Sequence, residues 1–294
     1  DYSEMDSLLA QKIQQLMIFF SLLIPDMTNE EEQMLDEALI RTYGKFGITH
    51  DNDSVYADRN AVPPKMKTMP ILGDLHEELQ KNEMTKRIAI IVSRFVTGSA
   101  QSFNQQTNVD LSNKYIVLDL SELKGKLLPV GMMIALDYVW DKIKSDRTKK
   151  KVIMIDEIWQ LIGAGSNRMA AEFCLEIFKV IRGFGGAAIS ATQDLSDFFG
   201  LEDGRYGRAI INNSKNKIIL NLEPDEAEFV RDTLKLTKTE IRSITRFERG
   251  EALICSNNSK VPVIIKASKE EQEMITTDRA ELEAILKERQ QEAD

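Results

Sequence analysis

Residues 151–159 read KVIMIDEIW, a short apolar run that ends in two neighbouring carboxylates, Asp156 and Glu157. The run from Lys151 to Ile155 has the near-continuous apolar character of a parallel strand that is buried on both faces. Open α/β sheets place their chemistry at the carboxyl ends of such strands. The pattern therefore indicates a Walker B element. An ordinary strand end followed by a helix cap is the alternative that this stretch leaves open. Trp159, just after the acids, is expected to be a buried helix anchor, with stacking on a partner as the alternative.

The two acids can divide the work of nucleotide hydrolysis between them. Asp156 is expected to hold Mg²⁺ through the water shell of the ion, because carboxylate oxygens and water are the ligands that Mg²⁺ prefers. Glu157 can then polarise the attacking water as a general base. We therefore expect Asp156 to be the metal-binding and nucleotide-binding acid, and Glu157 to be the catalytic one.

A second apolar run, AAISATQ at residues 187–193, ends in the neutral amide of Gln193. This run is the expected next strand, which would place Gln193 at the same edge of the sheet as the acids. An amide can donate to a phosphate oxygen and accept from the attacking water. Gln193 is therefore the expected γ-phosphate sensor.

An amphipathic segment, residues 168–182, connects the two predicted strands and has the apolar spacing of a helix. Gly183 is the expected stop of this helix. Arg182, at the end of the segment, has two interpretations. It can reach the nucleotide of a neighbouring subunit as an arginine finger, or it can only neutralise the C-terminal end of the helix dipole.

Four stretches follow one another along the chain in an order that is far more specific than any one of them. They are FNQQTNVDLSNKYIVLDLSEL at 103–123, KVIMIDEIWQLI at 151–162, KVIRGFGGAAISATQDLSDFF at 179–199 and FERGEALI at 247–254. Together they resemble the ATPase domain of conjugative type IV secretion systems, the VirB-type and TraC-type traffic ATPases. That branch belongs to the additional-strand RecA-like superfamily, which also holds the HerA and FtsK motors.

The resemblance implies an ATPase that works with ATP and Mg²⁺. It implies Asp156 and Glu157 as Walker B, Gln193 as the sensor, Arg182 as the finger, and a late motif near the subunit boundary that contains Arg249 and Glu251. It also implies a homo-oligomer, a hexamer in the working machine, with other secretion-channel and coupling proteins as partners. The implied location is the cytoplasmic face of the bacterial cell membrane, with peripheral attachment through partners.

One part of the family pattern is missing, because no GxxxxGK[ST] phosphate loop occurs in these 294 residues. Loop amides and a lysine supply most of the binding to the β- and γ-phosphates. We expect that loop to lie upstream of Asp1, in a longer protein of which this is an excerpt. The excerpt alone is then expected to be inactive. A naturally degenerate ATPase is the alternative.

The fold class expected is α/β, a RecA-like P-loop NTPase core with a mostly parallel sheet and an inserted all-helical subdomain. The predicted segments are a core helix of the ATPase domain at 1–25, the helical insertion at 26–100, the RecA-like core at 101–268 and a C-terminal helical segment at 269–294. Within them, the polar stretch after Asp26 is expected to open a second helix at about 28–46, and strands are expected at 114–120 and near 216–222, 251–256 and 261–266. Asp119, at the end of the first of these strands, is expected to cap the next turn, with a place facing the nucleotide as the alternative. The longest apolar run, at 16–24, is too short to span a bilayer, which needs about twenty residues.

Composition limits the remaining possibilities. The excess of 47 acidic over 38 basic residues gives a net charge of −9, which disfavours a broad nucleic-acid surface, although a total can conceal basic residues that gather in a pore. Direct DNA binding therefore stays open. The predicted function is ATP-powered conjugative secretion, in pilus assembly or in transfer of DNA or protein. The alternatives are a DNA-translocating motor of the coupling type and a non-catalytic scaffold with the same fold.

Overall fold

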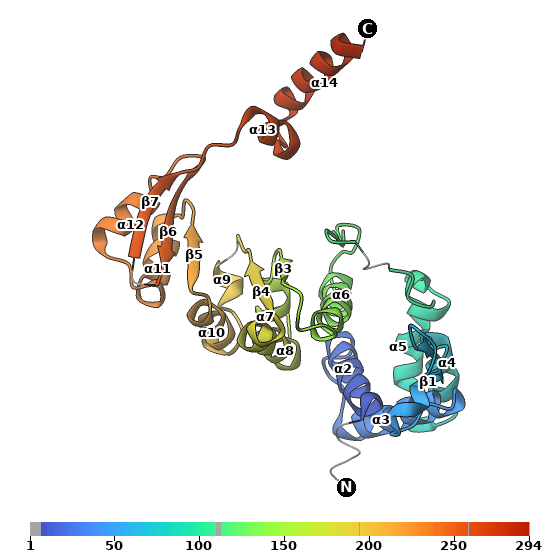
Figure 1. Ribbon diagram of the computed structural model, residues 1–294. Coiled ribbons are helices and arrows are strands. Elements are labelled where there is room, and N and C mark those ends of the chain that lie inside the picture. The colour runs from blue at the N-terminus through green and yellow to red at the C-terminus, as the bar shows by residue number, and fades with distance from the viewer. Residues whose placement is uncertain (1–6, 110–112, 194, 258, 294) are drawn as a thin grey trace. The chain divides into compact units, whose positions relative to one another are not determined.

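The structure is a computed structural model that describes residues 7–109, 113–193, 195–257 and 259–293 (Figure 1). Asp1, where the predicted core-helix segment begins, lies outside the described residues. The chain divides into two compact units, Asp1–Gly207 and Arg208–Asp294.

The first unit combines many helices with short strands. Its helices are α2 (Leu8–Leu23), α3 (Asn29–Lys45), α4 (Leu72–Leu79), α5 (Lys86–Val96), α6 (Leu127–Lys144), α7 (Trp159–Ile162), α8 (Arg168–Val180) and α9 (Leu195–Phe198), and α10 (Arg205–Asn213) continues into the second unit. Its strands are β1 (Tyr56–Asp58), β2 (Lys65–Met66), β3 (Lys151–Ile155) and β4 (Gly186–Ser190), and its 3-10 helices are Asn52–Val55, Glu83–Thr85, Gln101–Phe103, Ile181–Phe184 and Glu202–Gly204.

Side-chain caps explain where the first two helices begin. The Ser7 hydroxyl accepts a hydrogen bond from the Ala10 N–H over 3.1 Å at the start of α2. Thr28 and Glu31 form a reciprocal capping box at the start of α3, in which each side chain satisfies a backbone N–H that the helix leaves unpaired. The polar stretch after Asp26 therefore opens the second helix, as predicted from the sequence.

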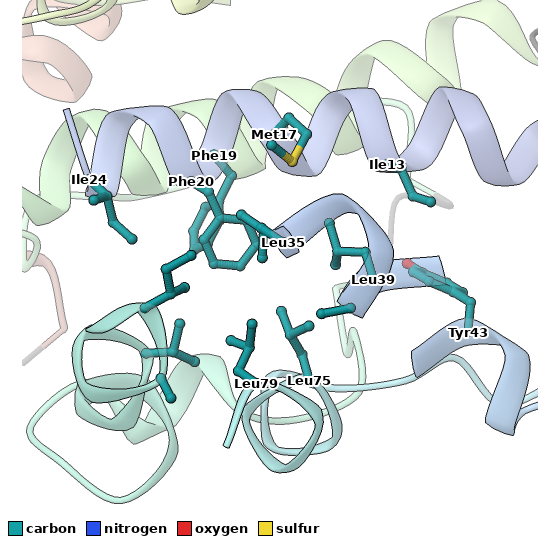
Figure 2. Close-up of a cluster of buried hydrophobic side chains, with 14 of the residues drawn as sticks. Ile13, Met17, Phe19, Phe20, Ile24, Leu35, Leu39, Tyr43, Leu75 and Leu79 are labelled. Carbon is teal, nitrogen blue, oxygen red and sulfur yellow. The ribbon is translucent and has the colours of Figure 1, made fainter. Parts of the chain in front are cut away.

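Helices α2 to α5 share one buried apolar cluster (Figure 2). Phe20 of α2 and Leu35 of α3 face Leu75 and Leu79 of α4 across this cluster, and Phe20, Leu35 and Leu79 are fully buried. Helix α2 also packs on α6 and α8. The apolar run of α2 thus belongs to a core helix. Among the described residues, no helix is long and apolar enough to cross a membrane.

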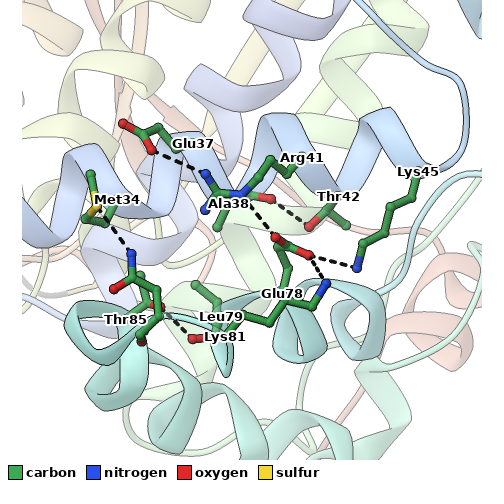
Figure 3. Close-up of polar contacts among 11 residues, drawn as sticks. Met34, Glu37, Ala38, Arg41, Thr42, Lys45, Glu78, Leu79, Lys81 and Thr85 are labelled. Atoms are coloured by element: carbon green, nitrogen blue, oxygen red, sulfur yellow. Dashed lines mark hydrogen bonds and ion pairs between the residues drawn. The ribbon is translucent and has the colours of Figure 1, made fainter.

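A buried carboxylate joins α3 to α4 (Figure 3). Glu78, whose side chain is 7% exposed, pairs with Arg41 at 3.0 Å, Lys45 at 2.9 Å and Lys81 at 2.7 Å. Hydrogen bonds from Lys81 and Lys45, with a further one from Arg41, lower the pKa of the Glu78 carboxyl to about 2. The cluster therefore fixes the packing of the two helices by charge-assisted hydrogen bonds.

Strands β3 and β4 form the parallel pair that the two apolar runs predicted. Their register pairs Lys151 with Gly186 and Ile155 with Ser190. Burial on both faces of β3, however, is a wrong expectation, because Val152 and Met154 are 67% and 74% exposed. Alternate side chains of a strand point to opposite faces. The described residues pack against the face of β3 that carries Ile153 and Ile155, and they leave the face with Val152 and Met154 exposed.

Two further local expectations are wrong. The strand predicted at 114–120 is not formed: the segment pairs with no strand in the part of the chain that the structure describes, and Tyr115 and Val117 are 86% and 71% exposed. Helix α8 does not stop at Gly183 but runs into a 3-10 turn, and the left-handed residue is Gly185, with φ of 73°. A Cβ at Gly185 would lie 2.8 Å from the carbonyl oxygen of Lys149, so glycine is required at that position.

The second unit is built on an antiparallel sheet. The sheet has the order β5 (Asn216–Ile219), β6 (Glu251–Ser256) and β7 (Ser259–Ile264), and the helices are α11 (Pro224–Leu234), α12 (Lys238–Ile244), α13 (Lys269–Ile275) and α14 (Arg279–Ala293). Leu253 and Cys255 of β6 are buried, as are Val230 of α11 and Ile244 of α12. The positions of these strands are as predicted from the sequence, but their antiparallel pairing was not foreseen.

Candidate active site

The parallel register of β3 and β4 brings the predicted acids and the predicted sensor to one end of the strand pair. Beyond the strands, the Ala191 N–H donates to the Ile155 carbonyl over 3.0 Å, and the Ile158 N–H donates to the Ala191 carbonyl over 3.3 Å. These bonds hold the two departing segments together past the last ladder position. Asp156 and Glu157 lie on one segment, and Gln193 lies on the other.

Glu157 is the centre of this arrangement. Gln193 Nε2 donates to Glu157 Oε1 over 2.6 Å, and Trp159 Nε1 donates to Glu157 Oε2. The backbone of Glu157 has φ of 49°, the left-handed region that residues with a Cβ seldom adopt. Strain of this kind occurs often at active sites, where the surrounding contacts maintain it. Here it turns the chain between β3 and α7.

Asp156 directly precedes Glu157 and is exposed. Its Oδ1 atom accepts a hydrogen bond from the Glu157 N–H over 3.0 Å. A single exposed carboxylate suits a Mg²⁺ ion that keeps several of its water ligands and takes others from the oxygens of a nucleotide. Among the described residues, no group of three or more His, Cys, Asp and Glu side chains could hold a metal ion. Asp156 thus fits a Mg²⁺ site whose oxygen ligands come partly from the protein and partly from the nucleotide.

Arg182 lies apart from these carboxylates within the chain. It belongs to the 3-10 turn Ile181–Phe184, which comes just before the first residue of β4, whereas Gln193 comes after the last. The strand between them spans about 13 Å at its usual rise per residue. Arg182 is exposed. A contact with the nucleotide of a neighbouring subunit stays a prediction.

Arg249 and Glu251 belong to the second unit, where they flank a tight turn into β6. Gly250 between them has φ of 90°, and a Cβ there would lie 2.8 Å from the Ile265 carbonyl oxygen. Glu251 Oε2 accepts the Glu248 N–H over 2.9 Å and so stabilises the turn.

The guanidinium of Arg249 is exposed and lies near the C-terminal helix α14. Hydrogen bonds from Thr276 and Gln272, together with the nearby charge of Arg249, lower the pKa of the Glu281 carboxyl. The expected roles of Arg249 and Glu251 at a subunit boundary stay predictions.

Trp159 is the site residue whose role the sequence did not reveal. Its position two residues after Glu157 predicted a buried helix anchor or a stacking surface, but the side chain is half-buried and its N–H donates to Glu157. The sequence contained one signal for this contact. A tryptophan two residues after a glutamate places an indole N–H, which can only donate, close to a carboxylate, which can only accept. Asp119, in contrast, caps a turn as expected, because its Oδ1 accepts the Ser121 N–H over 2.9 Å.

A parallel strand pair that ends in Asp-Glu on one strand and is followed by Gln on the other is typical of the P-loop NTPase class, whose members have an α/β core. Residues 73–293 match the TraG P-loop domain family, and the chain belongs to that family. The expected α/β fold and the resemblance to VirB-type and TraC-type ATPases are therefore confirmed.

The structure is similar to that of VirB4 of Thermoanaerobacter pseudethanolicus, with a TM-score of 0.80 and 26% identity, covering 90% of this chain and 71% of that one. Protein TraC of Escherichia coli is 32% identical over 116 residues, which are 38% of this chain and 13% of TraC. The DNA double-strand break repair helicase HerA of Sulfurisphaera tokodaii is 25% identical over 174 residues, 56% of this chain and 34% of HerA. The chain thus spans about a third or less of these two proteins.

Proposed function

We propose that this chain contributes the ATP-hydrolysing motor domain of a conjugative type IV secretion system. The observation that supports the proposal most strongly is the position of Glu157, held by Gln193 and Trp159 beside Asp156 at the carboxyl end of β3. The similarity to VirB4 and TraC supports the secretion context.

In this proposal Asp156 binds the water shell of Mg²⁺, and Glu157 accepts a proton from the attacking water. The oxygen of that water forms a bond to the γ-phosphorus of ATP while the bond from phosphorus to the ADP oxygen breaks. When bound, Mg²⁺ neutralises charge on the β- and γ-phosphates. Gln193 can turn its amide from Glu157 to the γ-phosphate, because an amide carries both a donor and an acceptor.

We further propose 1–25 as a core helix of the ATPase domain, 26–100 as an insertion, 101–268 as the RecA-like ATPase core and 269–294 as a terminal helical segment. The insertion is mostly but not entirely helical, because β1 and β2 lie within it. The match over 73–293 supports the shared core. Assembly as a hexamer, contacts with channel and coupling proteins and peripheral attachment to the cytoplasmic face of the membrane belong to the same proposal. The missing GxxxxGK[ST] loop predicts that residues 1–294 alone are inactive.

The similarity to HerA favours a second candidate, a motor that translocates DNA. Mg²⁺-dependent ATP hydrolysis by the intact protein, measured with and without duplex DNA, separates the candidates. The secretion ATPase predicts turnover that DNA does not change, and the translocating motor predicts turnover that DNA stimulates. Absence of turnover under both conditions would contradict both candidates and would favour a non-catalytic scaffold.

A further inference from the structure

Two different hydrogen-bond donors, an amide and an indole, bind the Glu157 carboxylate. Gln193 Nε2 donates to Oε1 over 2.6 Å, and Trp159 Nε1 donates to Oε2. The amide of Gln193 can rotate and can exchange its donor for an acceptor. The indole N–H of Trp159 is only a donor, and neither accepts nor titrates. The two oxygens of Glu157 therefore differ in how readily their partners can leave.

The local fold brings the indole of Trp159 to the Glu157 carboxylate. The left-handed backbone at Glu157 closes a turn, so that a side chain only two residues further on reaches back to its carboxylate. Trp159 is the first residue of α7, and its neighbours Ile158, Leu161 and Ile162 are fully buried. These buried neighbours hold the backbone from which the indole extends to Glu157.

We propose that Trp159 is a positioning residue that fixes the orientation of the Glu157 carboxylate, so that Oε1 is the oxygen that accepts the proton from water. This inference rests on the proposed function. When Gln193 turns to the phosphate, Oε1 becomes accessible to the water while Oε2 stays bound to the indole. Nucleotide sensing by Gln193 and activation of Glu157 thus occur together. The hydrogen bond from Trp159 keeps the carboxylate oriented while Gln193 leaves it.

The change Trp159→Phe in the intact protein keeps an aromatic ring and removes the donor. We expect kcat for ATP hydrolysis to fall roughly ten- to hundredfold, the range for a lost hydrogen bond to a charged group. KM should stay within about twofold, because the indole contacts the base and not the nucleotide. Trp140→Phe is the matched control, since Trp140 packs its ring on Phe184 at 5.4 Å, away from the acids, and it should leave kcat unchanged.

A double-mutant cycle distinguishes positioning of the base from a structural role. If Trp159 acts through Glu157, then Trp159→Phe should lower the residual single-turnover rate of a Glu157→Gln protein less than about twofold. Equal fold losses in the two backgrounds, or an unchanged kcat in the wild-type background, would overturn the role of Trp159 and leave the proposed function intact. Absence of Mg²⁺-dependent turnover in the wild-type protein would overturn the proposed function and this inference with it.

The variant Trp159→His provides a second arm, with turnover expressed per folded protein in both variants. Histidine keeps a planar ring with an N–H donor. Turnover above that of Trp159→Phe would support donation to Glu157 as the basis of the effect. Turnover no higher than that of a folded phenylalanine variant, or turnover lost with histidine although the protein is folded, would overturn it.

Discussion

The amide nitrogen of Gln193 lies 2.6 Å from Oε1 of Glu157. The residue proposed to sense the γ-phosphate therefore contacts the residue proposed to activate water. The parallel pairing of β3 and β4 brings them together although 36 positions separate them in the sequence. In this arrangement Gln193 has to leave Glu157 before it can bind a phosphate oxygen.

Asp156 should govern the part of ATP binding that depends on Mg²⁺. Asp156→Ala removes the carboxylate expected to hold the ion's water shell, so ATP affinity in the presence of Mg²⁺ should fall by roughly tenfold or more. Affinity measured with EDTA should stay the same. Isothermal titration calorimetry on the intact protein measures both.

A suitable control for Asp156→Ala is Asp232→Ala. The side chain of Asp232 is 91% exposed and pairs only loosely with its neighbour Arg231, at 3.3 Å. This variant should bind ATP as the wild-type protein does. Equal affinity of wild-type protein and Asp156→Ala in Mg²⁺ would remove Asp156 from the metal site.

Arg182 should act only when a neighbouring subunit is docked. An arginine supplied in trans stabilises transition-state charge at the next subunit, so Arg182→Ala should lower ATP hydrolysis most under conditions that favour assembly. A mixture of Arg182→Ala and Glu157→Gln subunits should recover part of the activity, because some mixed interfaces then contain both intact residues.

Lys179→Ala tests the alternative role of Arg182. Lys179 is an exposed cation in the last turn of α8, and it should match the effect of Arg182 if helix-end charge is all that matters. Similar losses in Lys179→Ala and Arg182→Ala, with no recovery in mixtures that are shown to co-assemble, would favour the structural role.

Glu78 should make stability depend on acid pH. The pKa of its carboxyl is about 2 in the folded chain, below the ordinary 4.5, because Lys81, Lys45 and Arg41 bond to its ionised form. This contribution is complete above about pH 4.5 and is lost as the pH falls toward 2. Glu78→Gln should lower the free energy of unfolding by about 1–3 kcal/mol at pH 7, with a smaller difference at low pH, as measured by urea denaturation.

The comparison for Glu78→Gln is Glu83→Gln. Glu83 pairs with Lys86, but its side chain is 82% exposed, and exposed pairs contribute little. This variant should change the unfolding free energy by less than about 1 kcal/mol at pH 7. A pH-independent loss in Glu78→Gln would contradict the role of the ion cluster.

The sequence was sufficient to predict the two strands that carry the site. Apolar runs that end in Asp156-Glu157 and in Gln193 mark both the strands and their carboxyl ends, and the polar stretch that starts at Thr28 marks where the second helix begins. These features are local, so residue type and spacing specify them.

Other features depend on distant parts of the chain. The apolar segment at 114–120 predicted a strand, but a strand exists only when a partner pairs with it. The donation from Trp159 to Glu157 requires a left-handed glutamate, a conformation that residue preference argues against. Sequence alone therefore located the acids and missed the side chain that orients one of them.

The most direct test of the account is ATP turnover by the Glu157→Gln form of the intact protein. This change keeps the size and polarity of the side chain and removes the base, so nucleotide binding should be preserved while turnover slows by a factor of order 10² or more. Glu176→Gln, which alters an exposed acid of α8, should hydrolyse ATP normally. Turnover of Glu157→Gln within a few-fold of wild type would contradict the assignment of Glu157 as the water-activating base.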